Sequence, residues 1–251
     1  MALNIIGIGL NDEKDITIKG LEIVKKSHKV FLEYYTSILQ VDVKDLENYY
    51  DKKIILADRD LVENNSDEIL NDAKDKDIAF LVIGDVFSAT THTDLKLRAI
   101  KKGIKVNIIN NASVLTAIGI TGLELYKFGK TTSIPFPQKG FEPETPYNVI
   151  KDNKNLHTLV LLDLKPQEEA FMSVNDAITY LLMVEDKRNE NIFTKDTYCI
   201  GIARLGKDDC LIKYGKAKDL MKIDFGKPLH CLIVPGKLHF VEEEALDIYK
   251  I

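Results

Sequence analysis

The sequence predicts an α/β protein made of two α/β domains, the first around a mostly parallel sheet and the second around a mixed sheet. In the first half, apolar strand-like runs alternate with helical segments, and this order is typical of a parallel sheet with helices on its faces. In the second half, several strand-like runs follow one another in quick succession, which predicts antiparallel pairs as well. The 251 residues suffice for two domains. We expect the domains to span residues 1–112 and 113–251.

The strands predicted for the first domain are short apolar runs. They are residues 3–9, 30–35, 54–57, 78–83 and 105–109. The run at 78–83 is apolar at every position, which is typical of a strand buried on both faces. The segments between the strands are predicted to be helices. These helices are residues 16–26, 42–50, 66–76, 93–102 and 113–125, and Thr93 is expected to cap the fourth.

The second domain begins with a segment, 135–146, that is crowded with proline and carries a glycine, which predicts a loop or an extended crossing segment. Strands are then predicted at 158–164, 198–205, 211–214 and 229–234, followed by a last helix from Val241. A helix is predicted over 173–186, because Ser173 and Asp176 fit a capping box and the apolar residues form one stripe. The charged segment 186–196 lacks periodicity and predicts an exposed loop.

The composition excludes several classes of protein. No apolar run is long enough to cross a bilayer, and the N-terminus has no basic segment before an apolar core, so we expect a cytoplasmic protein without membrane attachment. A formal charge of −5 argues against direct binding of nucleic acid. Cys199, Cys210 and Cys231 are far apart in apolar settings, as core residues in a reducing compartment are, and no His/Cys pair has the spacing of metal ligands. We therefore expect no metal site.

The segment Gly84-Asp85, which follows the buried strand at 78–83, is the best candidate for a binding site. Small and hydroxylic residues come next, and then a helix begins. A glycine lets a ligand approach the backbone, a carboxylate can meet a cation, and a helix start offers unpaired N–H groups. An ordinary strand-to-helix turn is the alternative interpretation of the same residues.

The first turn, from Gly7 to Asp12, partly matches a dinucleotide-binding motif. It has Gly-x-Gly after a strand, and Glu33 stands where an acid that binds ribose would be expected. Asp12, however, replaces the third glycine, and an acid there fits a diphosphate ligand poorly. The sequence also has no phosphate-binding loop with Gly-Lys-Ser/Thr, no Gly-x-Ser-x-Gly motif and no cysteine in an electropositive turn. A reaction without a protein nucleophile, such as methyl transfer from a sulfonium donor, suits this set of residues.

Several sequence blocks, in the same order along nearly the whole chain, resemble the diphthine synthases, a branch of the tetrapyrrole methylase-like methyltransferases. These blocks are residues 7–21, 33–37, 84–92, 119–123, 126–130, 224–226, 228–230 and 234–239. Two departures separate the chain from the tetrapyrrole enzymes. Val86 stands where they usually have proline after Gly-Asp, and Leu10-Asn11-Asp12 replaces a Gly-Pro-Gly-Asp pattern. Valine does not fix the backbone as proline does, yet we expect the site to survive.

The resemblance implies that S-adenosylmethionine is bound in a cleft between the two domains. Carried over position by position, its contacts are Leu10, Asp85, Ser88, Ser113, Val114, Leu164, Leu205 and His230. Each lies at or just beyond a predicted strand end or at a helix start, which is where open α/β sheets bind ligands. Asp85 could pair with the positive groups of the donor. Ser113 could both cap its helix and touch the ligand, and His230 could either donate to the adenine or only fill the wall of the site.

The resemblance also implies the reaction. The enzymes of this family act on elongation factor 2, and we expect trimethylation of the amino group of a 3-amino-3-carboxypropyl-histidine, which gives diphthine. No residue is an obvious base, so we expect the amine to lose its protons to water. A corrinoid or porphyrin methyltransferase is one alternative, and a non-catalytic S-adenosylmethionine-binding regulator is another. A homodimer is implied as well, with weak support from Tyr34, Tyr35, Tyr49 and Tyr50.

Overall fold

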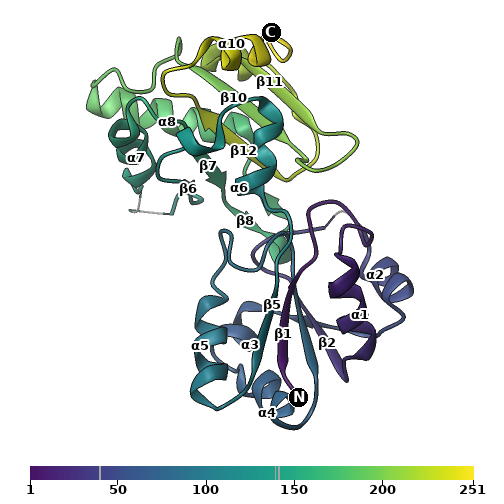
Figure 1. The fold of residues 1–251 in the computed structure, drawn as a ribbon. Helices are drawn as coiled ribbons and strands as arrows, with labels where there is room; N and C mark the ends of the chain where they lie inside the picture. Colours follow the sequence, from purple (N-terminus) through teal and green to yellow (C-terminus); the bar gives the residue numbers. More distant parts are fainter. Residues whose placement is uncertain (40, 139, 141) are drawn as a thin grey trace. The chain divides into compact units, whose positions relative to one another are not determined.

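The computed structural model describes residues 1–39, 41–138, 140 and 142–251. The chain forms two compact units, Met1–Leu115 and Thr116–Ile251. Each unit holds one five-stranded sheet (Figure 1). The sheet of the first unit is parallel and that of the second is mixed, so the predicted fold class is confirmed.

The sheet of the first unit has the strand order β3–β2–β4–β1–β5, and all neighbours run parallel. The strands are β1 Leu3–Gly7, β2 Lys29–Glu33, β3 Ile54–Ala57, β4 Ile78–Val82 and β5 Val106–Ile109. Every residue of β1 and β4 is buried, as predicted for β4. Because β1 lies between β4 and β5, the three loops that follow these strands start side by side at one edge of the sheet.

The helices of the first unit cover both faces of this sheet (Figure 1). They are α1 Ile18–Lys26, α2 Val43–Tyr50, α3 Arg59–Glu63, α4 Asp67–Asp75 and α5 Thr93–Lys101. The first two share a hydrophobic cluster with one face, and the other three share one with the opposite face. The predicted cap of α5 is wrong: Thr93 is the first helical residue, and the preceding His92 is buried against Phe80.

The helix predicted over 113–125 is broken into three short pieces. These are α6 Val114–Ala117 and the 3₁₀ turns η1 Ile118–Thr121 and η2 Leu125–Lys127. Gly122 ends η1 with a φ of +83°, which favours glycine, and a β-carbon there would lie 2.2 Å from that of Ala245. Close packing against a distant part of the chain thus overrides the helical pattern.

The sheet of the second unit has the strand order β11–β10–β12–β7–β6. Its strands are β6 Thr132–Ile134, β7 Thr158–Leu162, β10 Tyr198–Ala203, β11 Leu211–Lys216 and β12 His230–Val234. Only the β6–β7 pair is parallel among these neighbours. A small antiparallel pair, β8 Leu164–Lys165 and β9 Ala170–Phe171, follows β7. The predicted mixed sheet is therefore confirmed.

The helices of the second unit are α7 Thr145–Asn153, α8 Val174–Arg188, α9 Ala217–Leu220 and α10 Phe240–Asp247, with a 3₁₀ turn, η3, at Pro166–Glu168. The first three share one hydrophobic cluster with the sheet. The predicted capping box of Ser173 and Asp176 is present at the start of α8. The loop predicted over 135–146 includes Lys139 and Phe141, which lie outside the described residues, and its end is wrong because Pro146 lies in the first turn of α7.

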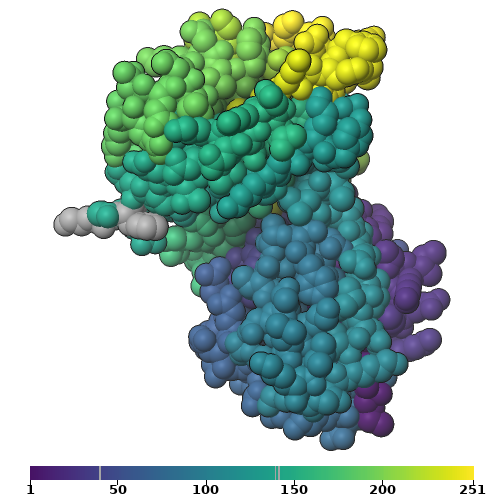
Figure 2. Space-filling view, turned by 60° about the vertical axis from the view of Figure 1, so that its left-hand side comes forward, coloured from purple at the N-terminus to yellow at the C-terminus, as the bar shows by residue number. Residues whose placement is uncertain are grey.

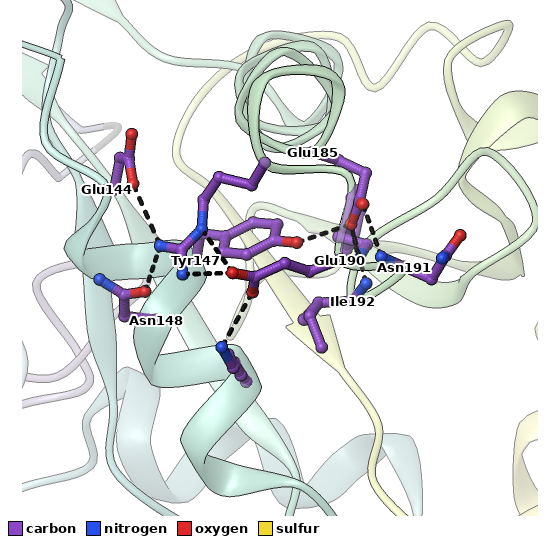
Figure 3. Close-up of polar contacts among 10 residues, drawn as sticks. Glu144, Tyr147, Asn148, Glu185, Glu190, Asn191 and Ile192 are labelled. Atoms are coloured by element: carbon purple, nitrogen blue, oxygen red, sulfur yellow. Dashed lines mark hydrogen bonds and ion pairs between the residues drawn. The ribbon is translucent and has the colours of Figure 1, made fainter.

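The segment after α8 is held by Glu185 and is not a simple exposed loop. The carboxylate of Glu185 accepts hydrogen bonds from the Tyr147 hydroxyl and the Asn191 backbone at 2.7 Å and from the Ile192 backbone at 2.8 Å (Figure 3). It also accepts from the backbone N–H of Phe193 at 2.9 Å. The side chain of Phe193 is fully buried. The prediction of a loop is confirmed from Asn189 onward and most of its residues are at least partly exposed, but residues 186–188 belong to α8 and Phe193 is buried. One buried acid near the end of the helix organises the backbone that follows.

Candidate functional site

Three loops of the first unit meet at the carboxyl edge of the parallel sheet. Gly9, after β1, and Gly84, after β4, exchange two backbone hydrogen bonds of 3.2 and 2.7 Å. The side-chain amide of Asn111, after β5, donates to the carbonyls of Gly7 at 3.0 Å and Asp15 at 2.9 Å. The residues predicted to bind a ligand here therefore stand on loops that are bonded to one another.

Asp85 joins two of these loops through both of its carboxylate oxygens. Oδ1 accepts from the Asn111 backbone at 2.9 Å and from the Asn110 amide at 3.0 Å. Oδ2 accepts from the Ser88 hydroxyl at 3.2 Å and from the Phe87 backbone at 3.5 Å. These last two contacts are long, so Oδ2 is the less firmly held oxygen. Asp85 is thus a structural clamp as well as a candidate ligand for a cation.

The charge of Asp85 is retained at neutral pH. Partial burial acts to raise the pKa of its carboxyl, but the hydrogen bonds, led by those from Asn111 and Asn110, prevail and lower the pKa below its usual range. All four of its donors are neutral groups. No described residue forms an ion pair with Asp85, so the ammonium or sulfonium group of a ligand would be attracted to its negative charge.

The backbone of Gly84 brings other predicted site residues together. It has a φ of +80°, and a methyl group placed on it would have Leu10 Cδ2 and Ala112 O at 3.8 Å and Ser113 Cα at 3.9 Å as its nearest neighbours. Val114 follows as the first residue of α6. Leu10, Asp85, Ser88, Ser113 and Val114 therefore belong to one small region of the first unit, and an added methyl group on Gly84 would touch its neighbours at ordinary contact distance.

Two features of these loops were not expected from the sequence. Asp15 accepts from the backbone N–H groups of Leu10 at 3.0 Å and Asn11 at 2.8 Å, and so it shapes the first loop. Val86, which replaces the proline of the tetrapyrrole enzymes, is fully buried, and the Thr90 hydroxyl donates to its carbonyl at 2.7 Å. The expected loss of rigidity at Val86 is thus offset by hydrogen bonds and burial.

The structure gives no support to the dinucleotide interpretation of the first turn. Helix α1 begins only at Ile18, so no helix N-terminus faces Gly7 and Gly9 directly. Glu33 is fully buried, and its carboxylate accepts from the backbone of Tyr35 and from the backbone and hydroxyl of Thr36. Burial raises the pKa of Glu33. It organises its own turn and is not free to bind ribose.

His230 and Leu205 lie at one end of the sheet in the second unit. His230 starts β12 and pairs with Ala203, the last residue of β10. Its Nδ1 accepts from the Val174 backbone at 3.4 Å, and its Nε2 bonds with the Lys227 carbonyl at 2.9 Å, so Nε2 carries the proton. Burial lowers the pKa of His230. Since its one N–H is used within the protein, the ring face or the backbone of His230 is what remains for a ligand.

Arg204, which precedes Leu205, holds the segment before His230. It has a φ of +53°, and its guanidinium donates to the carbonyls of Phe225 at 2.7 Å and Lys227 at 2.9 Å. No local pattern in the sequence indicates this role, because these two partners are backbone carbonyls; the guanidinium also pairs with Asp209 at 2.7 Å. Leu164, the remaining predicted residue, stands in β8, and its N–H donates to the side chain of Asp163 at 2.9 Å.

A surface pocket of about 350 Å³ opens beside His230. It is lined by Ser173, Asn175 and His230 together with the segment 221–226. Met221, Ile223 and Phe225 line it together with the charged Lys222 and Asp224, and Ser173 and Asn175 stand at the start of α8. The pocket therefore has a mixed apolar and polar lining next to His230.

The described residues offer neither a metal site nor a membrane span. No group of three His, Cys, Asp or Glu side chains in this part of the chain is placed to hold a metal ion. No helix that the structure describes is long and apolar enough to span a membrane. Cys199 and Cys231 are buried, as predicted, and Cys210 is partly exposed. Burial raises the pKa of each of these thiols, which argues against a reactive cysteine.

Comparisons with known proteins identify the class. The model of the Tetrapyrrole (Corrin/Porphyrin) Methylases matches residues 2–220, and the chain therefore belongs to the tetrapyrrole methylase family. It is 51 % identical over 243 residues to a diphthine synthase of Methanococcus maripaludis, with 96 % of this chain and 95 % of that protein covered. It is 44 % identical over 270 residues to the diphthine methyl ester synthase of Dictyostelium discoideum, with 100 % and 99 % covered.

Solved structures agree with these relatives. A crystal structure from Entamoeba histolytica matches with a TM-score of 0.93 at 47 % identity and covers 100 % of this chain and 98 % of its own. A crystal structure of a diphthine synthase matches with a TM-score of 0.91 at 40 % identity, with 100 % and 96 % covered. The resemblance to the diphthine synthases that the motif blocks indicated is thereby confirmed.

Proposed function

We propose that this protein is an S-adenosylmethionine-dependent methyltransferase of diphthamide biosynthesis that acts on elongation factor 2 in the cytoplasm. Identity of about half over nearly the whole length of diphthine synthases carries this conclusion. The alternatives of a corrinoid or porphyrin methyltransferase and of a non-catalytic regulator have no comparable support. The substrate of the reaction is the 3-amino-3-carboxypropyl group on a histidine of the factor, and its amino group receives the methyl groups.

The residues of both units fit S-adenosylmethionine. The ligand supplies a methyl group on a positively charged sulfur, which needs no protein nucleophile. Asp85 holds an uncancelled negative charge, and Gly84, which has no side chain, lets a ligand approach the backbone near Leu10 and Ser113. His230 stays neutral, since burial lowers its pKa, so it does not repel a cation. We propose that these residues contact the donor, together with Ser88, Val114, Leu164 and Leu205.

We propose that methylation stops at three methyl groups, which gives diphthine. The amino nitrogen keeps a lone pair until the third transfer, whereas a fourth transfer must use the neighbouring carboxylate, which is a weaker nucleophile. The protein's part is to hold donor and acceptor in line, and the amine loses its protons to water. The relatives include proteins named diphthine synthase and diphthine methyl ester synthase, so the product has to be measured.

We propose that the protein is a homodimer that pairs through β3, the edge strand of the first sheet. Ile55 and Leu56 on this strand are 41 % and 47 % exposed, and an exposed apolar edge invites strand pairing. Lys53 precedes the strand and Asp58 follows it, so antiparallel pairing of two copies would place unlike charges opposite each other. Of the tyrosines suspected from the sequence, Tyr34 and Tyr49 are exposed, whereas Tyr35 and Tyr50 are buried.

One assay tests the reaction and its stopping point. The protein is incubated with radiolabelled S-adenosylmethionine and with elongation factor 2 that carries the unmethylated intermediate. We expect label on the factor and, by mass spectrometry, a gain of three methyl groups. A further methyl that alkali removes would show that an ester is also formed. Binding of the donor without label on the factor would support a regulator, and label on a corrin or porphyrin would support the other alternative.

The dimer is tested by sedimentation. At micromolar concentration we expect a species of twice the 28.4 kDa of the chain, and Ile55→Lys should convert it to the monomer. A wild-type protein that sediments only as a monomer would contradict the proposal. A dimer that Ile55→Lys leaves intact would move the interface away from β3.

A further inference from the structure

Two of the motif blocks, residues 126–130 and 234–239, have no part in the site described above, yet the fold brings them together. The backbone of His157 exchanges hydrogen bonds of 2.9 Å with Lys127 and Gly129, and its Nδ1 accepts from the Gly236 backbone at 3.0 Å. Both blocks therefore pack around one buried histidine of the second unit. A structural role would explain the histidine, but it does not explain the side chains that the blocks expose.

A cluster of the buried Glu242 and His157 with the partly exposed Lys127 holds this region together. Glu242 Oε1 bonds with His157 Nε2 and the Glu124 backbone, both at 2.9 Å, while Oε2 accepts from Lys127 and from the His239 backbone at 2.8 Å. Glu242 and His157 are fully buried. Helix α10 is thereby fixed against η1 and η2, and the Tyr249 hydroxyl adds a bond of 3.0 Å to the Ile120 carbonyl.

An exposed apolar surface covers this rigid base, and we call it the α10 surface. It consists of Ile120, Leu125, Tyr126, Phe240, Val241 and Ile248. Tyr126 is 81 %, Ile248 79 % and Phe240 69 % exposed. In Figure 2 the yellow C-terminal residues and the teal segment that follows residue 116 adjoin on the outside of the molecule. Single exposed apolar residues are ordinary, but a group of six on one rigid surface is typical of a binding surface.

The charges on α10 indicate what this surface binds. Residues three or four apart share a helix face, so Glu244 lies beside Val241 and Ile248, and Glu243 lies beside Phe240. Neither glutamate has an ion pair with another described residue, whereas Lys127 and Lys250 are both paired. On α10 itself the apolar side chains are thus accompanied by free negative charges, whereas before the helix the exposed Lys237 also has no ion pair with a described residue. A complementary partner presents an apolar side chain among lysines or arginines.

We propose that the α10 surface is the docking site for the protein substrate, on a basic part of its surface. This inference rests on the proposed function, because an enzyme that acts on one histidine of a large protein needs a recognition surface beyond the reacting group. A rigid apolar surface suits that task, since little conformational entropy is lost when it binds. Aromatic side chains such as Tyr126 and Phe240 are the usual anchors of such interfaces.

A second copy of this chain is the less suitable occupant. In a two-fold dimer the same surface meets itself, so Glu243 and Glu244 of both copies would face one another. Like charges across an interface disfavour association. The edge strand β3 has unlike charges at its two ends and does not have this difficulty. The two exposed apolar regions therefore favour different partners.

The test compares steady-state kinetics of the wild-type protein with those of variants of the α10 surface. In Phe240→Ala/Ile248→Ala and in Tyr126→Ala, we expect KM for elongation factor 2 to rise at least tenfold. Affinity for S-adenosylmethionine and the rate with saturating free modified histidine amino acid should stay within twofold. Glu243→Lys/Glu244→Lys should also raise KM for the factor and weaken its dependence on salt. Leu97→Ala, which changes an exposed apolar residue of α5 in the first unit, is the matched control.

The outcomes separate this inference from the proposed function. If the wild type places no methyl group on elongation factor 2, the proposed function fails. If the wild type is active and the variants keep its KM for the factor, docking on the α10 surface is refuted while the function stands. If the variants sediment as monomers where the wild type is a dimer, the surface belongs to a second copy, which also refutes the inference.

Discussion

Asp85 in the first unit and Glu242 in the second are both carboxylates that accept from four hydrogen-bond donors. They differ in exposure to solvent and in whether a cation balances the negative charge. Burial acts to raise the pKa of each, and in each the hydrogen bonds prevail and lower it, for Glu242 to about 2. The donors to Asp85 are all neutral and the residue is partly exposed. Glu242 is fully buried and paired with Lys127. The charge that remains unbalanced and accessible distinguishes a ligand site from a structural one.

Glu185 shows that a carboxylate without a paired cation is not by itself a ligand site. Its donors are neutral, as those of Asp85 are, but three consecutive backbone amides and Tyr147 close around it, and it is 7 % exposed. Nearby ion pairs of Arg188 and Lys151 with Glu190 hold the surrounding helices. Glu185 thus has an unpaired charge but no access for a ligand. Both conditions, charge and access, are met at Asp85.

The largest expected effect is on stability, from the structural carboxylate. Glu242→Ala leaves His157, Lys127 and two backbone N–H groups without their acceptor. We expect the free energy of unfolding of the second unit to fall by about 3–5 kcal/mol, as when one partner of a buried ion pair is removed. Urea unfolding followed by circular dichroism, together with hydrogen exchange of β7, measures this loss.

The neighbouring Glu243→Ala is the control for this prediction, because Glu243 is exposed and has no ion pair with the described residues. We expect its effect to stay within about 0.5 kcal/mol. A loss of less than about 1 kcal/mol in Glu242→Ala would contradict the view that this carboxylate is a structural centre, since its four donors would then be satisfied by water.

The next effect is on ligand binding, from Asp85. Asp85→Ala should weaken S-adenosylmethionine binding by roughly 1–3 kcal/mol, the range for a charge-assisted hydrogen bond. Asp85→Asn keeps the shape and an acceptor for Asn111 but removes the charge, and we expect most of the same loss. Calorimetry measures both, with Asp94→Ala on the surface of α5 as control. Wild-type affinity in Asp85→Asn would show that Asp85 supports binding only through the hydrogen bonds that join the two loops. Wild-type affinity in both variants would show that Asp85 does not contact the ligand.

A smaller effect is expected from two glycines with the same backbone conformation. Gly84 and Gly103 have φ values of +80° and +73°, and neither has an atom within 3.4 Å of an added methyl group. Alanine at either position should cost about 1 kcal/mol of stability through strain. Only Gly84→Ala should also weaken the binding of S-adenosylmethionine, because its methyl group enters the space near Leu10 and Ser113. Equal affinities in the two variants would place the ligand away from Gly84.

The sequence predicts the strands and most helices well, because burial repeats with a period that the residues show. The hydrophobic period fails to predict local structure where a contact with a distant part of the chain determines it. At Gly122, packing against Ala245 breaks a predicted helix. The period fails again after α8, where Glu185 orders a segment that has no apolar pattern of its own. Such contacts join residues far apart in the chain or bind the backbone, and neither leaves a local signal.

The candidate site was predictable to the extent that its residues follow strands. Leu10, Asp85 and Ser113 lie where three neighbouring strands end, so the order of elements was enough to bring them together. Asn110 and Asn111 directly follow β5 and could have been added by the same reasoning, since they are polar residues at the same edge. The way in which Arg204 holds the segment before His230 could not be predicted, because the carbonyls that it contacts there are about twenty residues away in the chain.

The smallest expected effect concerns the buried histidines of the two units. Burial lowers the pKa of His92 to about 4, whereas for His157 the neighbouring Glu242 opposes the lowering that burial causes. An unfolded histidine takes up a proton near pH 6.5. The unfolded chain therefore binds more protons than the folded one as the pH falls from 7.5 to 5.5, and stability falls with it. For His92 the loss is about 1 kcal/mol over this range.

His92→Phe keeps an aromatic ring against Phe80 and Tyr35 and should remove the part of the pH dependence that His92 causes. Native-state hydrogen exchange of β4 at the two pH values measures this dependence of stability on pH. If His92→Phe leaves the dependence unchanged, His92 takes up a proton in the folded protein as readily as in the unfolded one, and another group must stabilise its charged form.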